Sequence, residues 1–584
     1  MIEVMHLGKR YGEIVAIEDV NFSVAKGEIL AFLGPNGAGK TTTMRILTCF
    51  MPATSGTAKV AGYDIFESPM EVKRRIGYLP DNPPVYPEMT VTEFLQFVAR
   101  IKGVPNHKLK AALASALEKC NLGDVARRLI GNLSRGYRQR VGLAQAMIHN
   151  PDVLILDEPT VGLDPKQIIE IRELIKSLGG EHTIVLSTHI LPEATAVSQK
   201  VVIINRGRIV AVDSQERLSA QVRKSEKISV RVRRADAVDT EKIVSIEGVQ
   251  QVLPQPSVDG EGLFIVESEL GRDIREELSK RVVECGWGLL EMKPLAVSLE
   301  EVFLQLTTEE KGVEEAAAAP VAPGGGAGMR NMMTLAGKEL KLYFISPIAY
   351  VLAMVFLMVS NYLFHSQVFF YSRLSSQAMQ FQGNLPQLNL HEILFRPTFL
   401  NMAIILLLIM PLLTMRLFAE EKKGRTTELL MTSPLTITEI VLGKFLAAWF
   451  IYALLLGLTL HLPLMLSHFT TVAWKPLIAS YLGLLLLGGV FLSMGLFASS
   501  LTENQIVAAV ISFGILIGFW LIGLTAQTMS DSPAGELFSY LSLLEHLDNF
   551  VKGLINTRDL TYFISLTILG LFLTHRVVES QRWK

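Results

Sequence analysis

Six long apolar runs in the second half of the chain constrain its fold more than any other feature. They lie at 347–367, 397–416, 444–466, 477–499, 505–525 and 560–577. Each is close to the ~20 residues that an α-helix needs to cross about 30 Å of hydrocarbon. One such run could be a buried helix of a soluble core, but six in succession indicate a membrane domain.

Charged residues divide the chain at the same place. Residues 1–328 hold 39 Lys/Arg and 43 Asp/Glu, whereas residues 329–584 hold 16 and 13. About a quarter of the residues of an ordinary soluble chain are charged, which fits only the first part. A uniform soluble globule, a disordered chain and a collagen-like chain are therefore excluded. The formal net charge of −1 gives no support for a nucleic-acid-binding surface.

Composition shifts predict a multidomain chain with four segments. Residues 1–220 mix strand-like apolar runs with helical stretches, which indicates an α/β core around a largely parallel sheet. Residues 221–310 begin with the alternating pattern KISVRVRR and continue into a helix-like stretch, typical of a small α+β appendage. The Ala/Pro/Gly-rich residues 311–329 indicate a flexible linker. Residues 330–584 then form an all-α domain with six spans, which an amphipathic helix near 330–345 precedes.

Basic residues predict the orientation of the spans. The N-terminal sequence lacks the basic segment and apolar core of a secretory signal peptide, so we expect the first half in the cytosol. Six spans then return the C-terminus to the cytosol. The inner segments carry 11 Lys/Arg and the outer segments carry 5, which agrees with the positive-inside rule.

A phosphate-binding motif lies near the N-terminus. Residues 34–42 read GPNGAGKTT and stand between the strand-like EILAFL and the helix-like TTTMRILTC. This is the strand–loop–helix context that a G-x-x-x-x-G-K-[ST] motif requires. We expect Lys40 to reach the β- and γ-phosphates and the Thr41 hydroxyl to bind Mg²⁺. The predicted ATP-binding residues of this segment are Gly34, Asn36, Gly37, Gly39, Lys40, Thr41 and Thr42.

A second motif ends in two carboxylates. Val153–Leu156 is an apolar strand, and Asp157 and Glu158 follow it directly. We expect Asp157 to hold the Mg²⁺ shell and Glu158 to be the general base that polarises the attacking water.

Together these motifs resemble the nucleotide-binding domain of an ABC (ATP-binding cassette) transporter over residues 1–308. The stretch 133–139, LSRGYRQ, resembles the family's signature motif, although Arg135 and Tyr137 replace its usual glycine and glutamine. The resemblance implies that Ser134 and Gly136 clasp the γ-phosphate of ATP held by a partner domain.

Three further residues match family positions. Asp164 lies in a segment similar to the D-loop at the dimer interface, and His189 resembles the switch histidine that contacts the γ-phosphate. Tyr11 matches the aromatic residue that stacks on adenine. His182 matches no such position, and we expect it on the surface.

The position of the family's Q-loop glutamine holds Asp81 here. A carboxylate can still meet Mg²⁺ through water, so Asp81 joins Thr41 and Asp157 as an expected metal contact, and hydrolysis need not be lost. Coupling to the membrane domain can nevertheless change. We expect Asp81→Ala to lower transport-coupled hydrolysis more than ATP affinity.

One phosphate loop and one signature motif per chain imply a dimer, because this family holds ATP between the loop of one domain and the signature of another. The expected partner is a second copy of the chain or a related half-transporter, and a symmetric dimer is the simplest arrangement.

The second half resembles an ABC-2-type permease. Residues 417–434 are similar to the cytosolic coupling segment of such permeases, which makes Glu420, Glu421 and Glu428 candidates for contact with the ATPase. The C-terminal run from Leu544 through Asp559, ending in Glu579–Trp583, most resembles the permease of the gliding-motility-associated ABC transporters. That branch implies an auxiliary membrane protein with a large periplasmic domain as a possible partner.

Polar residues inside the apolar runs leave two interpretations open. Asn401 and His461 could serve transport or could form helix–helix hydrogen bonds, and we favour the latter.

Two functions follow. The first is an ATP-driven half-transporter in a bacterial inner membrane that exports a lipid, polysaccharide or amphipathic compound. The alternative is a mechanotransmitter that uses ATP to move a periplasmic partner without moving a solute.

Overall fold

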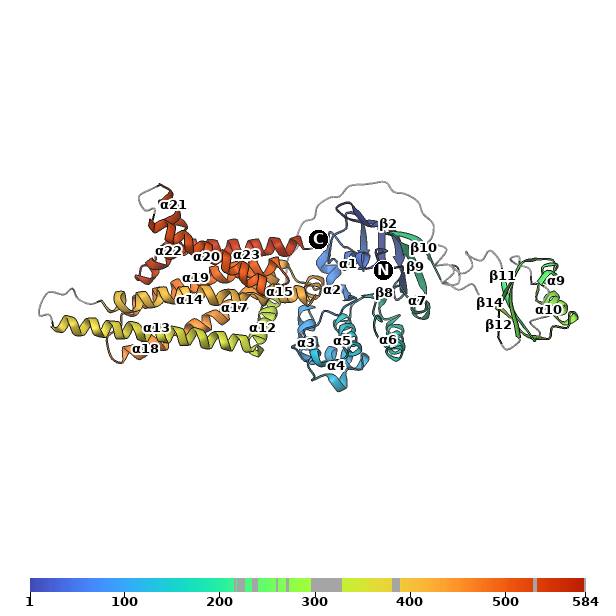
Figure 1. The fold of residues 1–584 in the computed structure, drawn as a ribbon, viewed down its shortest axis with the longest axis horizontal. Helices are drawn as coiled ribbons and strands as arrows, with labels where there is room; N and C mark the ends of the chain where they lie inside the picture. The colour runs from blue at the N-terminus through green and yellow to red at the C-terminus, as the bar shows by residue number, and fades with distance from the viewer. Residues whose placement is uncertain are drawn as a thin grey trace. The chain divides into compact units, whose positions relative to one another are not determined.

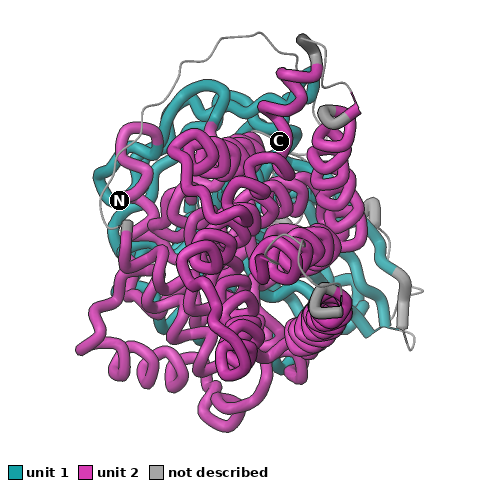
Figure 2. The backbone as a smooth tube through the Cα atoms, turned by 90° about the vertical axis from the view of Figure 1, so that its left-hand side faces the viewer, with its two compact units in different colours: residues 1–47, 53–65, 152–320 teal, residues 48–52, 66–151, 321–584 magenta. Residues whose placement is uncertain are grey.

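The chain forms two compact units (Figure 2). Unit 1 comprises Met1–Leu47, Ala53–Ile65 and Asp152–Pro320, and unit 2 comprises Thr48–Pro52, Phe66–Pro151 and Val321–Lys584. The computed structural model describes residues 1–214, 217, 226–233, 240–258, 261–268, 273–295, 328–380, 389–528 and 533–581. The predicted linker lies outside these residues except for its last two positions. The four predicted domain boundaries stay predictions.

Unit 1 contains a largely parallel sheet that carries the phosphate-loop motif. Five strands lie in the order β10 (Arg208–Asp213), β9 (Lys200–Asn205), β3 (Ile29–Leu33), β8 (Thr183–Thr188) and β7 (Val153–Asp157). All neighbours are parallel except β9 and β10. Every residue of β3, β7 and β8 is buried, as expected for parallel strands covered on both faces. The carboxyl ends of β3, β8 and β7 therefore meet at one edge, where ligands bind in such sheets.

Helices α1 (Lys40–Leu47), α6 (Pro165–Leu178) and α7 (Leu191–Val197) accompany this sheet. Helix α1 packs against β7, and α7 packs against β3 and β8. A second, antiparallel sheet has the order β2 (Ile14–Val24), β1 (Ile2–Tyr11), β4 (Ser55–Val60) and β5 (Tyr63–Asp64). Its register shifts several times along β1.

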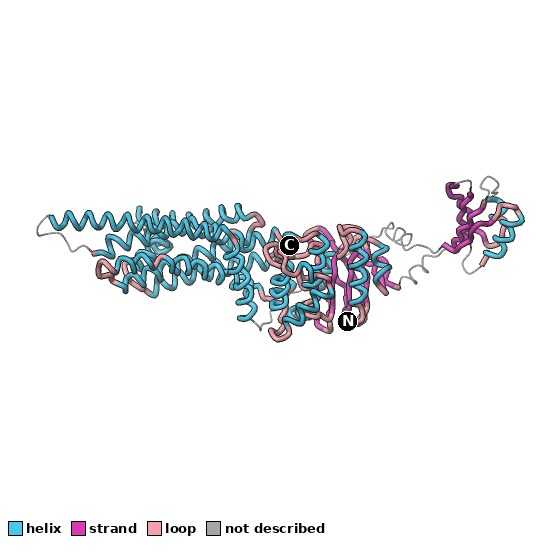
Figure 3. The backbone as a smooth tube through the Cα atoms, turned by 90° about the horizontal axis from the view of Figure 1, so that it is seen from below, coloured by secondary structure: helices cyan, strands magenta, loops and turns pink. Residues whose placement is uncertain are grey.

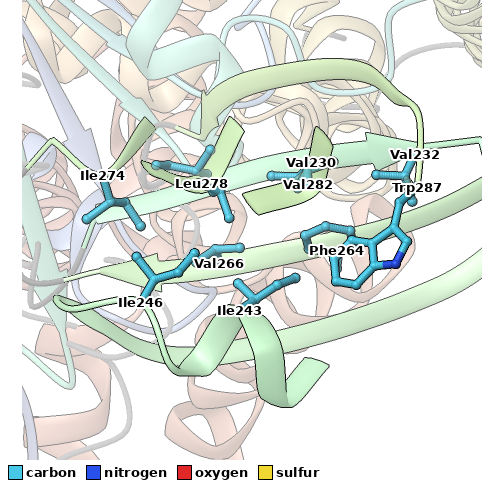
Figure 4. Close-up of a cluster of buried hydrophobic side chains, with 11 residues drawn as sticks. Val230, Val232, Ile243, Ile246, Phe264, Val266, Ile274, Leu278, Val282 and Trp287 are labelled. Carbon is cyan, nitrogen blue, oxygen red and sulfur yellow. The ribbon is translucent and has the colours of Figure 1, made fainter. Parts of the chain in front are cut away.

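The predicted appendage is a small α+β fold. It runs β11 (Glu226–Val232), α9 (Thr240–Val244), β12 (Val249–Val258), β13 (Glu261–Ser268), α10 (Arg275–Glu284) and β14 (Leu289–Leu295). The antiparallel strand order β12-β13-β11-β14 makes this a ferredoxin-like β-α-β-β-α-β arrangement. Trp287 and Phe264 lie in its apolar core (Figure 4).

Unit 2 begins with a mainly helical segment, residues 66–151. It contains α2 (Pro69–Arg75), β6 (Ile76–Leu79), α3 (Val91–Ile101), α4 (Leu109–Lys119) and α5 (Arg135–Met147). Helix α3 starts at a capping box formed by Thr90 and Glu93, which explains why it begins there.

In the part of the chain that the structure describes, the membrane half of unit 2 consists of helices joined by loops (Figures 1 and 3). Its described helices are α12 (Gly328–Ile345), α13 (Pro347–Gln380), α14 (Arg396–Thr414), α15 (Arg416–Lys423), α16 (Thr427–Thr432), α17 (Ile437–Leu458), α18 (His461–Ser467), α19 (Trp474–Leu501), α20 (Gln505–Thr528), α21 (Pro533–Leu541), α22 (Leu543–Val551) and α23 (Thr557–Ser580).

Among the described residues, six helical stretches are long and apolar enough to cross a membrane. They are 347–377, 391–423, 437–467, 474–501, 505–525 and 557–580, and each contains one of the predicted runs. The α/β fold followed by six apolar helices confirms the predicted fold class.

Helix α19 lies at the centre of this bundle. It packs against α14, α17, α20, α22 and α23. Of the residues in its most apolar stretch, 72% are buried, whereas the corresponding share for α20 is 22%. Glycines let neighbours approach it closely. A Cβ on Gly488 would lie 2.0 Å from the Tyr452 ring, and one on Gly495 would lie 2.2 Å from Thr414 Oγ1. Small residues at such contacts are typical of membrane helix packing.

The two ends of the bundle differ in what they contact. At one end, α15 meets the carboxyl end of α19, where Lys422 Nζ and Gln581 Nε2 both donate to Ser500 O. At the other end, Arg396 forms two hydrogen bonds to Asp548, of 2.8 and 2.9 Å. The predicted inner segment around Lys422 and the predicted outer segment around Asp548 therefore lie at opposite ends.

Candidate ATP site and coupling contacts of unit 2

The phosphate loop has the geometry of an anion cradle. Lys40, 5% exposed, donates from Nζ to Gly34 O at 2.9 Å and to Pro35 O at 3.2 Å. Gly37 and Gly39 have φ values of +80° and +102°, which side chains other than glycine's rarely adopt. A Cβ on Gly37 would have no heavy atom within 4 Å, so the backbone there is open to a ligand. This loop fits the phosphates of a nucleotide.

Glu158 stands where the carboxyl ends of the strands meet. Its φ is +48°, an uncommon value for a residue other than glycine. Its backbone N donates to Ser187 O at 3.1 Å. Its carboxylate lies 3.4 Å from Lys40 Nζ, and its Oε2 lies 3.0 Å from His189 Nδ1. The structure therefore brings together three residues that the sequence predicted for ATP hydrolysis.

The two predicted Mg²⁺ contacts of unit 1 flank this centre. Asp157 ends β7 and is fully buried, and its Oδ1 accepts a hydrogen bond from Ser187 Oγ. Thr41 lies in the first turn of α1, the helix that packs against β7. A hydroxyl and a carboxylate are oxygen donors of the kind that Mg²⁺ prefers.

Tyr11 and Asp164 lie at the ends of elements near the loop and the sheet. The Tyr11 phenol hydrogen-bonds with Thr42, and burial raises its pKa, so the ring stands beside the phosphate loop. Asp164 accepts from Gln167 N at 2.9 Å and caps α6. This cap gives Asp164 a structural role that the sequence analysis did not predict. Asn36 is exposed within the loop.

The other predicted ATP contacts belong to unit 2. Ser134 caps α5 by accepting from Tyr137 N at 3.4 Å, and Gly136 is buried in its first turn. The unusual Tyr137 donates from its hydroxyl to Asp124 Oδ2 at 2.8 Å. The roles of Ser134 and Gly136 at the γ-phosphate stay predictions.

Asp81, the predicted Q-loop residue, faces the permease segment. Its Oδ1 lies 3.8 Å from Arg425 Nη1, and both side chains are more than half exposed. A pair this exposed is worth at most about 1 kcal/mol. Asp81 therefore contacts the predicted coupling segment, but this ion pair contributes little to the stability of the contact.

The prediction for His182 was wrong. We expected it on the surface, but its side chain is buried, with 3% exposed. Its backbone N donates to Leu178 O at 3.0 Å as α6 ends. A single polar residue before a strand carries no periodic pattern, so no feature of the sequence indicated its burial.

Tyr86 connects the ATPase segment of unit 2 with the membrane helices. Its hydroxyl donates to both carboxylate oxygens of Glu421, at 3.0 and 3.2 Å. Lys338 Nζ lies 3.9 Å from the centre of its ring. Burial, then the nearby Glu421, raises the Tyr86 pKa well above its ordinary value, which keeps the phenol protonated as a donor. Glu421, one of the three predicted acidic contacts, is thus hydrogen-bonded to the ATPase segment.

Glu421 belongs to a buried cluster of two lysines and two carboxylates, which we call the ion cluster: Lys338, Glu339, Glu421 and Lys444. Lys338 lies 2.7 Å from Glu421 and 2.9 Å from Glu339, while Lys444 lies 2.9 Å and 2.5 Å from the same two residues. All four side chains are at most 6% exposed. Charges this deeply buried must be balanced, and here two positive charges meet two negative ones.

Two more lysines connect the ATPase segment of unit 2 with the membrane half of the same unit. Lys341 of α12 pairs with Glu93 of α3, and the buried Lys102 donates from Nζ to Thr432 O of α16 at 3.1 Å. Burial, with Lys73 nearby, lowers the pKa of Lys102 to about 7. The coupling segment therefore contacts the end of α3 through a backbone carbonyl, while α12 contacts α3 through a side-chain ion pair.

Sequence reasoning missed Tyr86, Lys102 and the pairing of the ion cluster. Lys444 was counted only as one basic residue of an inner segment. Its place at the start of an apolar run was a usable signal, because a cation there needs a buried partner.

Of the two polar residues noted inside the apolar runs, His461 forms the kind of helix–helix hydrogen bond that we favoured. His461 Nε2 lies 2.9 Å from Asn361 Oδ1, a hydrogen bond between helices α18 and α13. Asn401 is half-buried in α14.

Comparison with known families follows the same division of the chain. Residues 17–161 match the family model described as ABC transporter, and residues 373–574 match the model described as ABC-2 family transporter protein. The similarity to gliding-motility-associated transporters stays a prediction.

Individual proteins resemble the first half. The bacitracin transport ATP-binding protein BcrA of Bacillus licheniformis is 36% identical over 308 residues, which cover 52% of this chain and 97% of that protein. The daunorubicin resistance ATP-binding protein DrrA3 of Streptomyces coeruleorubidus is 32% identical, over 53% of this chain and 96% of that protein. A solved structure titled "Structure of ATP binding subunit of ABC transporter" is 32% identical and covers 38% of this chain and 92% of that one, with a TM-score of 0.35.

Proposed function

Because this chain belongs to the ABC transporter family, with an ATP-binding domain fused to an ABC-2-type permease, we propose that it is an ATP-driven exporter of a lipid, polysaccharide or amphipathic compound. It is an ATP hydrolase whose hydrolysis is coupled to membrane transport. The names of two relatives refer to bacitracin transport and daunorubicin resistance, which supports a transport role for this chain.

The observation that carries this proposal is the Tyr86–Glu421 contact. Tyr86 lies five residues after Asp81 in the ATPase segment, and Glu421 lies at the end of a membrane-spanning stretch. Both are buried within unit 2. A movement of residues 81–86 on ATP binding would therefore be transmitted to α15 and, through the ion cluster, to α12 and α17.

At the ATP site the chain's own residues have separate tasks. Lys40 and the loop amides hold the phosphates, and Thr41 and Asp157 would hold Mg²⁺, with Asp81 as a third contact through water. Bound Mg²⁺ neutralises phosphate charge. Glu158 accepts the proton of the attacking water, and His189 orients the Glu158 carboxylate from 3.0 Å. Tyr11 stacks on the base.

The proposed working form is a homodimer or a dimer with a related half-transporter. Ser134, Gly136 and Asp164 of one chain would complete the ATP site of the other. We place it in a bacterial inner membrane with the ATPase and both termini in the cytoplasm.

ATP hydrolysis by the purified chain in liposomes tests the proposal, with Glu158→Gln as the inactive variant. We expect this variant to retain ATP binding and to lose about 100-fold or more in rate, because the general base contributes 10²–10⁴-fold. Stimulation of the wild type by one class of lipid or amphiphile would support export. Stimulation by no such compound would favour the mechanotransmitter.

A further inference from the structure

A groove with one charged end runs along α23, at the end of the bundle away from Glu421. Its volume is about 480 Å³, within the usual range for small-molecule sites. Thr557 and Arg558 lie at its polar end, and Leu566 and Leu569 line its apolar end. Tyr540 of α21 forms part of the opposite wall. Figure 1 shows α21 and α22 beside one end of α23, with the C-terminus at the other.

Arg558 presents its charge to this groove. The guanidinium carbon lies 4.7 Å from the centre of the Tyr540 ring, a cation–π contact that positions the group without neutralising it. Within the part of the chain that the structure describes, Arg558 has no carboxylate within ion-pair distance.

The neighbouring Asp559 is fully engaged elsewhere. Its Oδ1 lies 2.5 Å from His546 Nδ1, and its Oδ2 accepts from Asn549 at 3.0 Å and from Asn556 at 3.2 Å. Asp559 is 1% exposed, so it points into the contact between α22 and α23. This contact holds the polar end of the groove in place and leaves the Arg558 charge available.

The groove has the polarity of an amphiphile. Its residues on α23 extend from Thr557 to Leu569, about 18 Å at 1.5 Å per residue. The span itself begins at Thr557, so we expect Arg558 at the level of the lipid headgroups and Leu569 within the hydrocarbon. A ligand that fills this groove needs an anionic head and an apolar tail.

We propose that this groove binds an amphiphile with an anionic headgroup, which Arg558 recognises while its tail lies against Leu566 and Leu569. The proposal rests on the proposed export function, because it takes this amphiphile to belong to the class of compounds that the chain exports. Arg558 offers planar, bidentate donors that suit phosphate or carboxylate.

The test is photo-crosslinking of the full-length chain in nanodiscs. The probes are photoreactive phosphatidylglycerol and a photoreactive phosphatidylcholine with the same acyl chains. We expect phosphatidylglycerol to label the groove about tenfold more than phosphatidylcholine, the effect of one charge-assisted hydrogen-bonded contact. Arg558→Gln should reduce its labelling to the phosphatidylcholine level, and Arg558→Lys should retain part of the preference.

Arg373→Gln is the matched control, because Arg373 is also exposed and lies 5.8 Å from the Phe369 ring but outside the groove. It should change nothing. Leu569→Trp fills the apolar end while leaving Arg558 intact, and it should lower labelling even if Arg558→Gln fails to fold. Equal labelling by both lipids, or unchanged labelling in Arg558→Gln, would overturn the proposal. So would complete protection by inorganic phosphate alone, since a free anion would then suffice.

ATP hydrolysis is measured on the same preparations. Crosslinking requires no hydrolysis, so absent wild-type activity would count against the proposed function only. Normal activity without Arg558-dependent labelling would count against the groove only.

Discussion

Removing one carboxylate from the ion cluster should destabilise unit 2 strongly. In Glu421→Gln, Lys338 and Lys444 would share the single carboxylate of Glu339, which leaves one uncompensated positive charge among side chains at most 6% exposed. Breaking a buried ion pair in this way costs about 3–5 kcal/mol. Large domains lose roughly 2 °C of Tm per kcal/mol, so we expect a decrease of about 6–10 °C.

Thermal unfolding of the purified protein in detergent measures this decrease. Glu420→Gln is the control one residue away. Glu420 pairs with Arg416 at 3.2 Å but is 41% exposed, so its loss should cost at most about 1 kcal/mol. The double variant Glu421→Gln/Lys444→Met restores neutrality and should regain part of the lost stability. The reasoning is refuted if Glu421→Gln shifts Tm no more than Glu420→Gln, or if adding Lys444→Met regains nothing.

Three further changes test other parts of the structure. Burial lowers the pKa of Lys102 from 10.5 to about 7 in the folded protein, so the unfolded chain binds more protons than the folded one above pH 7. The stability of the wild type relative to Lys102→Met should therefore rise by up to about 1.4 kcal/mol per pH unit between pH 7 and 10. Parallel curves of Tm against pH for the two proteins would contradict this. Gly488→Ala should destabilise by about 1–3 kcal/mol because its Cβ would overlap the Tyr452 ring, whereas Gly514→Ala, with no atom within 4 Å, should not lower Tm. Trp287→Ala should lower the free energy of unfolding of the appendage by about 3–5 kcal/mol, because Trp287 is 2% exposed in its core. Limited proteolysis should then cleave within 226–295, while ATP hydrolysis persists.

Local patterns of the sequence determined a large part of this protein. The phosphate loop could be predicted because its glycines, lysine and flanking strand and helix are contiguous along the chain, and the structure keeps them as one loop around Lys40. The six spans could be predicted because crossing a membrane requires a continuous apolar run. The Asp157–Glu158 pair was recognisable because it ends an apolar strand.

Tertiary structure alone decided which distant residues meet. Tyr86 and Glu421 are 335 positions apart, and Asp559 pairs with His546 while the adjacent Arg558 lies over the Tyr540 ring. Such pairings depend on which face each helix presents after packing, and no local period records that choice. The same limit explains why the sequence predicted a charged coupling segment but not that its central glutamate is buried between two lysines.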